Sequence, residues 1–477
     1  MKHLMKICIV LTAIAFIASP AFAEVQNVKV SGDILTRGAY RESYTLQDDA
    51  QQTVDGALSD EHDNLIATAV RLRVDADLTD NVSTVVRLLS EYQWDTEANQ
   101  SVGADGGADA NDIVMDLANV TLKEVFYQPL TVTVGRQDIR LGNGLVVGDP
   151  DTNALSGDAN MGFGDLSLRK SFDAVTAVLD YDPLTVDLIY AKINETGTDK
   201  DDEDLYGINA GYKFDQYDAE AEVYWILSKN EDETAPVVTN ANDGHEIHTI
   251  GTRGSIAVTE DLNLMGEFAW QRGDYDQITI GATRDVSASA FQIGADYSGL
   301  NLAWDPIIKA GITHYSGEEV GNTGDMSAWL PLYEDQSHGV VANFVLSGMN
   351  GGQNSNADIY TIGASATPME DLSISADIFW FYLDKKLVLT DNALANTGTA
   401  LDWANQGTRE NDMNLKADDE LGYEVDLALN YDYTEDVKMG LCAGWFVPGE
   451  ALDGVSGTDE KCDQTALQVM ATLGVNF

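Results

Sequence analysis

Basic residues are scarce in this sequence. Only 27 lysines and arginines stand against 79 aspartates and glutamates, which gives the 477 residues a formal net charge of −52. Proteins that bind nucleic acid present clustered basic side chains to phosphates, and nothing here forms such a stripe. Nucleic acid is therefore disfavoured as a partner. The acidic excess does not indicate a disordered chain either, because 44% of the residues are hydrophobic.

Long hydrophobic runs are also missing. An apolar stretch at 7–18 follows two lysines and precedes Ala21 and Ala23, the small–x–small pattern of a signal-peptide cleavage site. We expect residues 1–23 to be removed and the mature chain to begin at Glu24. No later segment approaches the roughly 18 consecutive apolar residues of a membrane-spanning helix. Export without helical spans leaves the periplasm, secretion or an outer-membrane β-barrel.

Cysteine and histidine are rare, with 3 and 6 residues respectively. Cys8 lies in the predicted signal peptide, which leaves Cys442 and Cys462 to form one disulfide or to remain two thiols. No serine, histidine and acid stand at a recognisable catalytic spacing, and a nucleophile would have to pair with one of these few histidines. We therefore do not expect an enzyme, and an outer-membrane hydrolase is the less favoured alternative.

What the chain has in abundance is alternation of apolar and polar residues. Segments 66–78 and 82–94 each place apolar residues on one face and charged or polar residues on the other. The last stretch, 465–477, alternates in the same way. A period of two predicts strands with one apolar and one polar face. The short polar spacer 79–81 predicts a tight turn between the first two.

Short turns and long loops alternate along the whole chain. The expected turns lie at 79–81, 127–129, 182–183, 215–218, 259–261, 298–300, 367–371 and 434–436. The expected loops, rich in glycine and aspartate, are 43–63, 96–111, 143–170, 194–203, 229–245, 273–286, 316–357, 385–418 and 448–463. Short periplasmic turns with long acidic extracellular loops are typical of transmembrane antiparallel β-barrels. We expect an all-β barrel of about 18 strands over 24–477, with the apolar patch 339–349 packed inside its loop.

Polar faces that point into a barrel of this size line an aqueous channel. Arg71, Arg73, Arg87 and Glu91 have the parity of the lumen face. Rings of charge at such positions tune ion selectivity. The alternative is that arginine–carboxylate pairs merely brace the wall. Further acidic candidates for the lumen are Asp75, Asp77, Asp138, Glu220, Glu222, Glu267, Asp296, Asp377, Glu424 and Asp426.

One charged segment does not follow the simple parity. If the alternation of Val134 continued, Arg136, Asp138 and Arg140 would point into lipid. Charges there cost about 2–4 kcal/mol each near the midplane. A β-bulge at Gly135 would turn all three inward, and glycine is a common bulge residue. We therefore predict a bulge at this position.

A candidate cation site lies in an expected loop. Asp105, Asp109, Asn111 and Asp112 place several oxygen ligands on a flexible, glycine-containing turn. Hard cations such as Ca²⁺ prefer such ligands. The spacing does not match an EF-hand, and solvated acidity is the alternative. No other cofactor is expected.

Two motifs resemble known outer-membrane proteins. The stretch from Val134 to Asp149, VGRQDIRLGNGLVVGD, resembles the strand-and-loop signature of the alginate export family of bacterial outer-membrane barrels. The segment 324–333 with His338 and Gly339 is similar to a second, weaker piece of that pattern. The resemblance implies an 18-stranded channel for an anionic polysaccharide or small anions. It also implies that lumen arginines guide the substrate and that Asp138 positions them; the guides would be Arg71, Arg73, Arg87, Arg136 and Arg140.

The end of the chain carries a further resemblance. The alternating strand closes on Phe477 with no tail, which resembles the sorting signal of outer-membrane barrels. It implies recognition by the barrel-assembly machinery. The physical counterpart is that the last strand must pair with the first, because an open sheet edge cannot sit in lipid.

Taken as a whole, the sequence predicts an outer-membrane β-barrel that acts as a passive, porin-like channel. Its substrates would be small polar solutes, ions or a polysaccharide. The acidic balance leaves cations and neutral sugars open beside the anionic polysaccharide. The alternative class is a barrel that serves as a structural sheath around a partner protein. Such a sheath would have a lumen of small residues with few charges.

Overall fold

The structure is a computed structural model, and it describes only part of the chain. The predicted signal peptide, the candidate Ca²⁺ ligands Asp105, Asp109, Asn111 and Asp112, and Cys462 all lie outside the described residues. The described residues are 27–44, 46, 53–54, 57–58, 62–94, 113–150, 166–195, 202–230, 244–277, 282–319, 322, 324–346, 354–386, 418–452 and 463–477.

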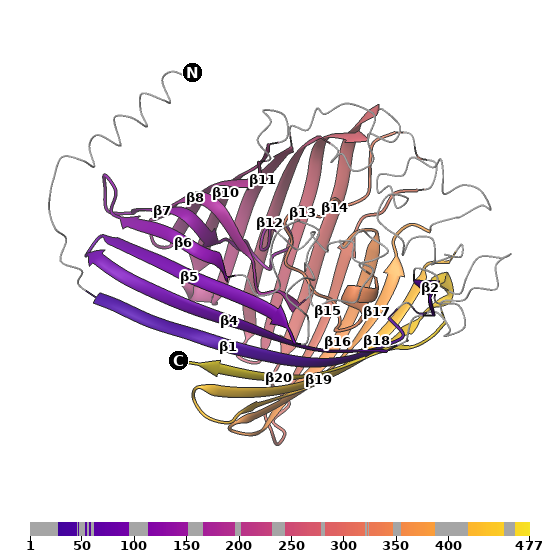
Figure 1. Cartoon of the computed structure of the whole chain (residues 1–477). Coiled ribbons are helices and arrows are strands. Elements are labelled where there is room, and N and C mark those ends of the chain that lie inside the picture. Colours follow the sequence, from indigo (N-terminus) through magenta and orange to yellow (C-terminus); the bar gives the residue numbers. More distant parts are fainter. Residues whose placement is uncertain are drawn as a thin grey trace.

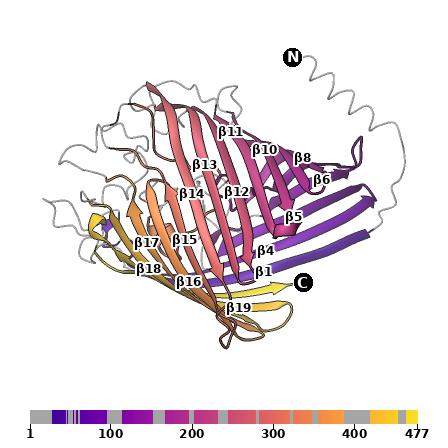
Figure 2. The same cartoon turned by 180° about the vertical axis from the view of Figure 1, so that it is seen from behind.

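Eighteen strands form one antiparallel sheet that closes into a barrel (Figures 1 and 2). Each strand pairs with the next one along the chain, apart from a separate two-residue hairpin, β2 (Thr53–Val54) with β3 (Ala57–Leu58). The barrel strands are β1 (Asn27–Glu42), β4 (His62–Thr79), β5 (Val82–Gln93), β6 (Ile113–Lys123), β7 (Leu130–Asp138), β8 (Ser171–Asp180), β9 (Leu184–Asn194), β10 (Glu203–Phe214), β11 (Ala219–Asn230), β12 (His245–Thr259), β13 (Leu262–Gln277), β14 (Ala282–Tyr297), β15 (Ile307–Tyr315), β16 (Ala357–Met369), β17 (Leu372–Leu383), β18 (Glu420–Asp432), β19 (Val437–Pro448) and β20 (Ala466–Asn476).

The barrel closes where its two ends meet. Strand β20 pairs with β1 from Asp33↔Asn476 to Glu42↔Leu467, and the two ribbons lie side by side in Figure 1. Beyond this ladder, Gly32 and Phe477 exchange two backbone hydrogen bonds of 2.9 Å. Every strand therefore has two neighbours, as a sheet in lipid requires. The predicted pairing of the first and last strands is confirmed, whereas recognition of Phe477 by the assembly machinery stays a prediction.

Alternation decides which side chains face outward. Val223, Ile250 and Ile362 are each at least half exposed on the outer face. Tyr224 and Thr249, which adjoin the first two in sequence, and Ile359, three residues before Ile362, have the opposite, inward parity and are buried. An outer surface of apolar side chains suits lipid, and an inner face of mixed polarity suits a lumen. Among the described residues, no helix has the length and hydrophobicity needed to cross a membrane.

The predicted connections agree with the strand bounds in most places. Eight connections lie at one end of the barrel, the turn end; Asp80–Asn81 and Glu370–Asp371 are two residues each. The expected turn 298–300 is longer than predicted, because β14 ends at Tyr297 and β15 starts only at Ile307. The other end, the loop end, has nine connections. The expected loop 273–286 is shorter than predicted, because β13 continues to Gln277 and β14 starts at Ala282. Cross-strand pairs such as Asp274↔Asp285 extend the ladder there, so polar residues that resembled a loop belong to a hairpin.

Two connections fold into the barrel at the loop end and form what we call the plug, residues 139–150 and 324–346. A parallel bridge joins Val147 to Tyr333, and the Gly148 N–H donates to the Tyr333 carbonyl oxygen at 2.7 Å. The plug includes the helical turn α2 (Ala342–Val345). Its fully buried side chains, Trp329 and Leu145 among them, pack against the inner wall in one apolar cluster. The prediction that the patch 339–349 packs within its loop is confirmed for the described residues 339–346.

Candidate functional site: the lumen wall and the plug

The two arginines of β4 face the lumen and are ion-paired. Arg71 Nε lies 2.9 Å from Asp33 Oδ1, and these residues are directly opposed in the β1–β4 ladder. Arg73 Nη2 lies 2.7 Å from Asp75 Oδ1 on the same strand. All four side chains are partly exposed. Each arginine thus has a carboxylate within contact distance, so that its charge is balanced locally.

Arg87, on β5, lies between two acids. Its Nε contacts Asp116, whose side chain is completely buried, and its Nη2 lies 3.4 Å from Asp138 Oδ2. The buried position of Asp116 follows from a register shift between β5 and β6 beside Arg87 and Leu88. Asp138 thus lies beside a lumen arginine, and its role in positioning the arginines stays a prediction. Asp116 was missed because only the three-dimensional register brings it to Arg87.

The predicted bulge at Gly135 is wrong. The registers of β7 with β6 and with β8 run through Gly135 without a shift. Arg136 therefore keeps the outward parity of Val134, and it pairs with Asp173 across β8 at 2.5 Å. Glycine is required at position 135 for another reason: its φ is +117°, and a β-carbon there would lie 2.2 Å from the Ala118 carbonyl oxygen. Arg136 lies near the loop end, where a charge on the lipid face costs only about 0–1 kcal/mol.

Arg140 and Glu91 hold loops in place. Arg140 forms an ion pair with Asp335 of the other plug segment and donates to the Asn143 carbonyl oxygen at 2.6 Å. Glu91 accepts hydrogen bonds from the Ser167 hydroxyl and the Leu168 N–H, both at 2.8 Å. All five predicted guiding arginines are thus ion-paired, and four of them lie at the lumen or the plug. Their role in guiding a substrate stays a prediction.

Arg253, on β12, is a lumen arginine that sequence reasoning missed. Its Nη1 lies 2.8 Å from Glu220 Oε1 and 3.0 Å from Glu222 Oε1, both on β11. Its Nε donates to the Asn143 side chain at 3.2 Å, which ties this wall to the plug. Counting parity along β12 from the start of the strand would have found it.

Wall carboxylates hold the plug by its backbone. Glu424, on β18, is fully buried and accepts the N–H groups of Val340, Val341 and Ala342 at 2.6, 2.7 and 2.6 Å. The neighbouring lumen acid Asp426 accepts the Val340 N–H at 3.0 Å. These bonds satisfy N–H groups at the start of α2 that have no partner within the helical turn. Because Glu424 and Asp426 point inward, as their strand parity predicted, they can hold the plug by its backbone N–H groups.

Other strands of the wall, β10 and β13, also hold the plug. Glu267, on β13, accepts the Tyr224 hydroxyl at 2.8 Å and the Asn143 N–H at 3.2 Å. The Tyr333 hydroxyl donates to Glu203 at 2.7 Å. The plug is thus fixed by side chains from widely separated strands, which is consistent with one well-defined position.

Burial in the plug shifts the pKa values of Glu334 and His338. Burial raises the pKa of Glu334 to about 8, although Asn354 donates to its carboxylate from its backbone and side chain at 3.0 and 3.1 Å. Burial lowers the pKa of His338 to about 4. Its Nε2 lies 3.1 Å from the Tyr315 hydroxyl. Both groups are therefore neutral near pH 7 while the plug is docked.

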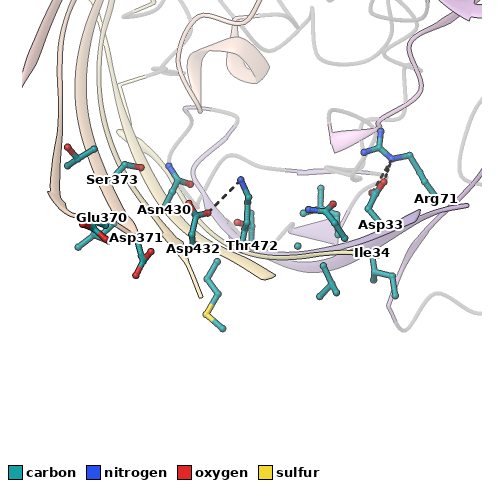
Figure 3. Close-up of a pocket in the computed structure, with 17 residues that line it drawn as sticks. Asp33, Ile34, Arg71, Glu370, Asp371, Ser373, Asn430, Asp432 and Thr472 are labelled. Carbon is teal, nitrogen blue, oxygen red and sulfur yellow. Dashed lines mark hydrogen bonds and ion pairs between the residues drawn. The ribbon is translucent and has the colours of Figure 1, made fainter. Parts of the chain in front are cut away.

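A cavity of about 590 Å³ lies at the turn end, inside the wall formed by β1, β4 and β16–β20 (Figure 3). The Arg71–Asp33 pair lines one side, and Asn430, Asp432 and Thr472 line the other. Lys438 Nζ lies 3.6 Å from Asp432 Oδ1. Glu370 and Asp371 add two further carboxylates. We call this cavity the vestibule; acids outnumber bases among its lining residues.

Comparison with known proteins identifies the family. The sequence profile of the alginate export family matches residues 36–461. None of the curated proteins matches the sequence. Among solved structures, OccAB1 of Acinetobacter baumannii superposes with a TM-score of 0.52 at 12% identity, covering 96% of this chain and 100% of that chain. OprD of Pseudomonas aeruginosa gives 0.50 at 10% identity, covering 95% and 98%.

The outer membrane protein opdK of Pseudomonas aeruginosa is similar in the same way, with a TM-score of 0.51 at 10% identity over 94% of this chain and 98% of that chain. At such identities the likeness concerns the fold alone. The family profile covers most of the chain. The β-barrel fold is what this chain shares with the solved structures. The protein therefore belongs to the alginate export family and is a channel-type β-barrel of the bacterial outer membrane.

Proposed function

We propose that the protein is a passive channel for small polar solutes and ions that favours cations over anions, with the turn end facing the periplasm. One observation carries the proposal: each of the five predicted guiding arginines, Arg71, Arg73, Arg87, Arg136 and Arg140, is already paired with a carboxylate. A paired arginine presents little net charge to a passing solute. A conduit for a polyanion such as alginate would instead need basic side chains in excess of acids.

The balance of acidic and basic side chains along the lumen wall also favours cations over anions. Arg253 is shared by Glu220 and Glu222, and Arg87 is shared by Asp116 and Asp138. Within the part of the wall that the structure describes, none of the salt bridges involves the lumen acids Asp187 and Asp377. A lumen with such an acidic surplus concentrates cations and repels anions.

The plug bears on the size of the solute. Its buried side chains occupy the loop end of the barrel and pack against the wall. A solute that crosses the barrel must therefore pass beside the plug. This arrangement favours small solutes over a polymer chain.

The proposal is tested by solute uptake into liposomes that contain the refolded protein. Three solutes of similar size would be compared: a neutral pentose, a cationic amino acid and a uronate. We expect the uptake rates to rank cation, then neutral, then anion. Fastest entry of the uronate would overturn the proposal and favour an anionic substrate. Entry of none of the three would favour the sheath alternative.

A further inference from the structure

Three potential metal ligands meet at the loop end of the barrel. His314 lies in β15, Asp358 in β16, and Asp384 directly follows β17. One ligand atom from each residue lies within 4.8 Å of the other two, and His314 Nδ1 is 2.7 Å from Asp358 Oδ1. This cluster, which we call the rim triad, is separate from the lumen wall and the plug.

The ladder brings the rim triad together. His314 and Asp358 are directly opposed in the β15–β16 register. The β16–β17 pairing ends at Ala357↔Leu383, which places the following residue, Asp384, beside them. Both His314 and Asp358 have the parity of the exposed Ile312 and Tyr360, and so they belong to the outer face. Their side chains are 19% and 29% exposed, so that a small cation can reach them.

Neighbouring groups hold the ligands in position. The Phe291 ring stacks on the His314 imidazole, with centroids 5.0 Å apart and planes 26° from parallel. The Gly317 N–H donates to Asp384 Oδ2 at 2.8 Å, which fixes that carboxylate. Such supporting contacts orient metal ligands in proteins. One group competes: Lys385 Nζ lies 3.1 Å from Asp384 Oδ1, on a flexible side chain that is 38% exposed.

We propose that the rim triad binds one divalent transition-metal ion, with Zn²⁺ as the representative. One imidazole nitrogen and two carboxylate oxygens are a ligand set that zinc accepts, with water completing the coordination. Imidazole distinguishes the site from those of Ca²⁺ and Mg²⁺, which take oxygen ligands. The cation would replace the direct His314–Asp358 hydrogen bond and displace the Lys385 ammonium.

The position of the rim triad gives the ion a structural role. His314 and Asp358 flank the connection 316–356, which contains one of the two plug segments. Gly317, at the start of this connection, is already bound to Asp384. A cation held by all three ligands ties together both ends of the connection and the chain after β17.

The test is metal titration of the full-length protein, refolded in detergent and prepared without a histidine tag. Zn²⁺ binding would be measured by calorimetry, and Co²⁺ binding by visible absorption. The variants are His314→Ala and Asp384→Asn. The matched control is His248→Ala, because His248 Nε2 also faces a carboxylate, Glu246, at 3.4 Å, but the described residues provide no third ligand there. Folding of each variant would be verified by its heat-modifiable mobility on gels.

We expect one Zn²⁺ per wild-type chain and an unchanged affinity in His248→Ala. Each triad variant should bind at least about tenfold more weakly, the smallest loss seen even for supporting partners. Wild-type protein without stoichiometric binding would overturn the proposal. Equal affinity in Asp384→Asn would also overturn it, because that variant keeps the histidine and should fold.

Discussion

Glu424 is the wall residue whose loss should release the plug. It is fully buried on β18, where Oε1 accepts the Val340 and Val341 N–H groups and Oε2 accepts the Ala342 N–H. In Glu424→Gln the amide oxygen can keep the first two bonds. The amide nitrogen, however, replaces Oε2 and turns a donor toward the Ala342 N–H. Ala342 is completely buried, so water cannot satisfy this group.

The magnitude follows from these bonds. A buried N–H left without an acceptor costs about 1–3 kcal/mol. The barrel itself keeps its hydrogen bonds, and so the cost falls on docking of the plug. A shift of about 1–3 kcal/mol raises the undocked fraction roughly 5- to 150-fold.

Limited proteolysis measures this fraction. Trp329 and Tyr333 are chymotrypsin sites that are buried in the docked plug. When docking is fast relative to cleavage, the cleavage rate follows the undocked population. We expect cleavage at these two sites, identified by mass spectrometry, to accelerate in Glu424→Gln by that factor.

Asp377→Asn is the matched control. Asp377 is a lumen acid of β17, directly opposed to Asp426 in the ladder, but none of the described hydrogen bonds joins it to the plug. Its substitution should leave plug cleavage unchanged. If Glu424→Gln and Asp377→Asn are cleaved at the same rate, the reasoning about the plug is refuted.

Three further predictions follow from individual side chains. Arg87→Met leaves the buried Asp116 carboxylate without its closest cation, and it should lower the free energy of unfolding in urea by about 3–5 kcal/mol. Arg73→Met removes one partner of a half-exposed pair and should cost about 1 kcal/mol or less. Equal losses in the two variants would contradict the idea that burial makes the Arg87–Asp116 pair more costly to break. Docking holds the pKa of Glu334 at about 8, above its ordinary 4.5, so the contribution of Glu334 to docking is fully present below pH 4.5 and is lost as the pH rises through about 8. Plug cleavage should therefore rise between neutral and alkaline pH in wild type but not in Glu334→Gln, and a rise in both would exclude Glu334 as the cause. Arg71→Gln should increase cation preference because it leaves Asp33 unpaired in the vestibule, whereas Arg136→Gln, on the outer face, should not change it; a change in the second variant would place Arg136 in the lumen.

Much of the barrel could be predicted from the sequence because strand alternation and turn chemistry are local. The alternation of 66–78 and 82–94 predicts strands where the structure has β4 and β5. The spacer between them predicts the turn at Asp80–Asn81. The inward parity of Glu424 and Asp426 needed only the strand pattern. The burial of 339–346 followed from an apolar patch that an 18-strand count could not accommodate.

The rest depends on register and on contacts between distant residues. Arg140 meets Asp335, and Tyr333 meets Glu203, across long stretches of chain. No periodicity reports such contacts, and so the plug was not predicted as a unit. A glycine within a strand pattern can mark a bulge or a close backbone approach, and Gly135 is an example of the second.

The most direct test of the account is the reversal potential of the refolded wild-type protein in a planar bilayer under a KCl gradient. The paired arginines and the acidic surplus of the lumen wall predict a potential of the sign that marks cation preference. A potential of the opposite sign would mean that the ion-paired arginines still control permeation. The proposed cation preference would then be wrong, and an anionic substrate would take its place.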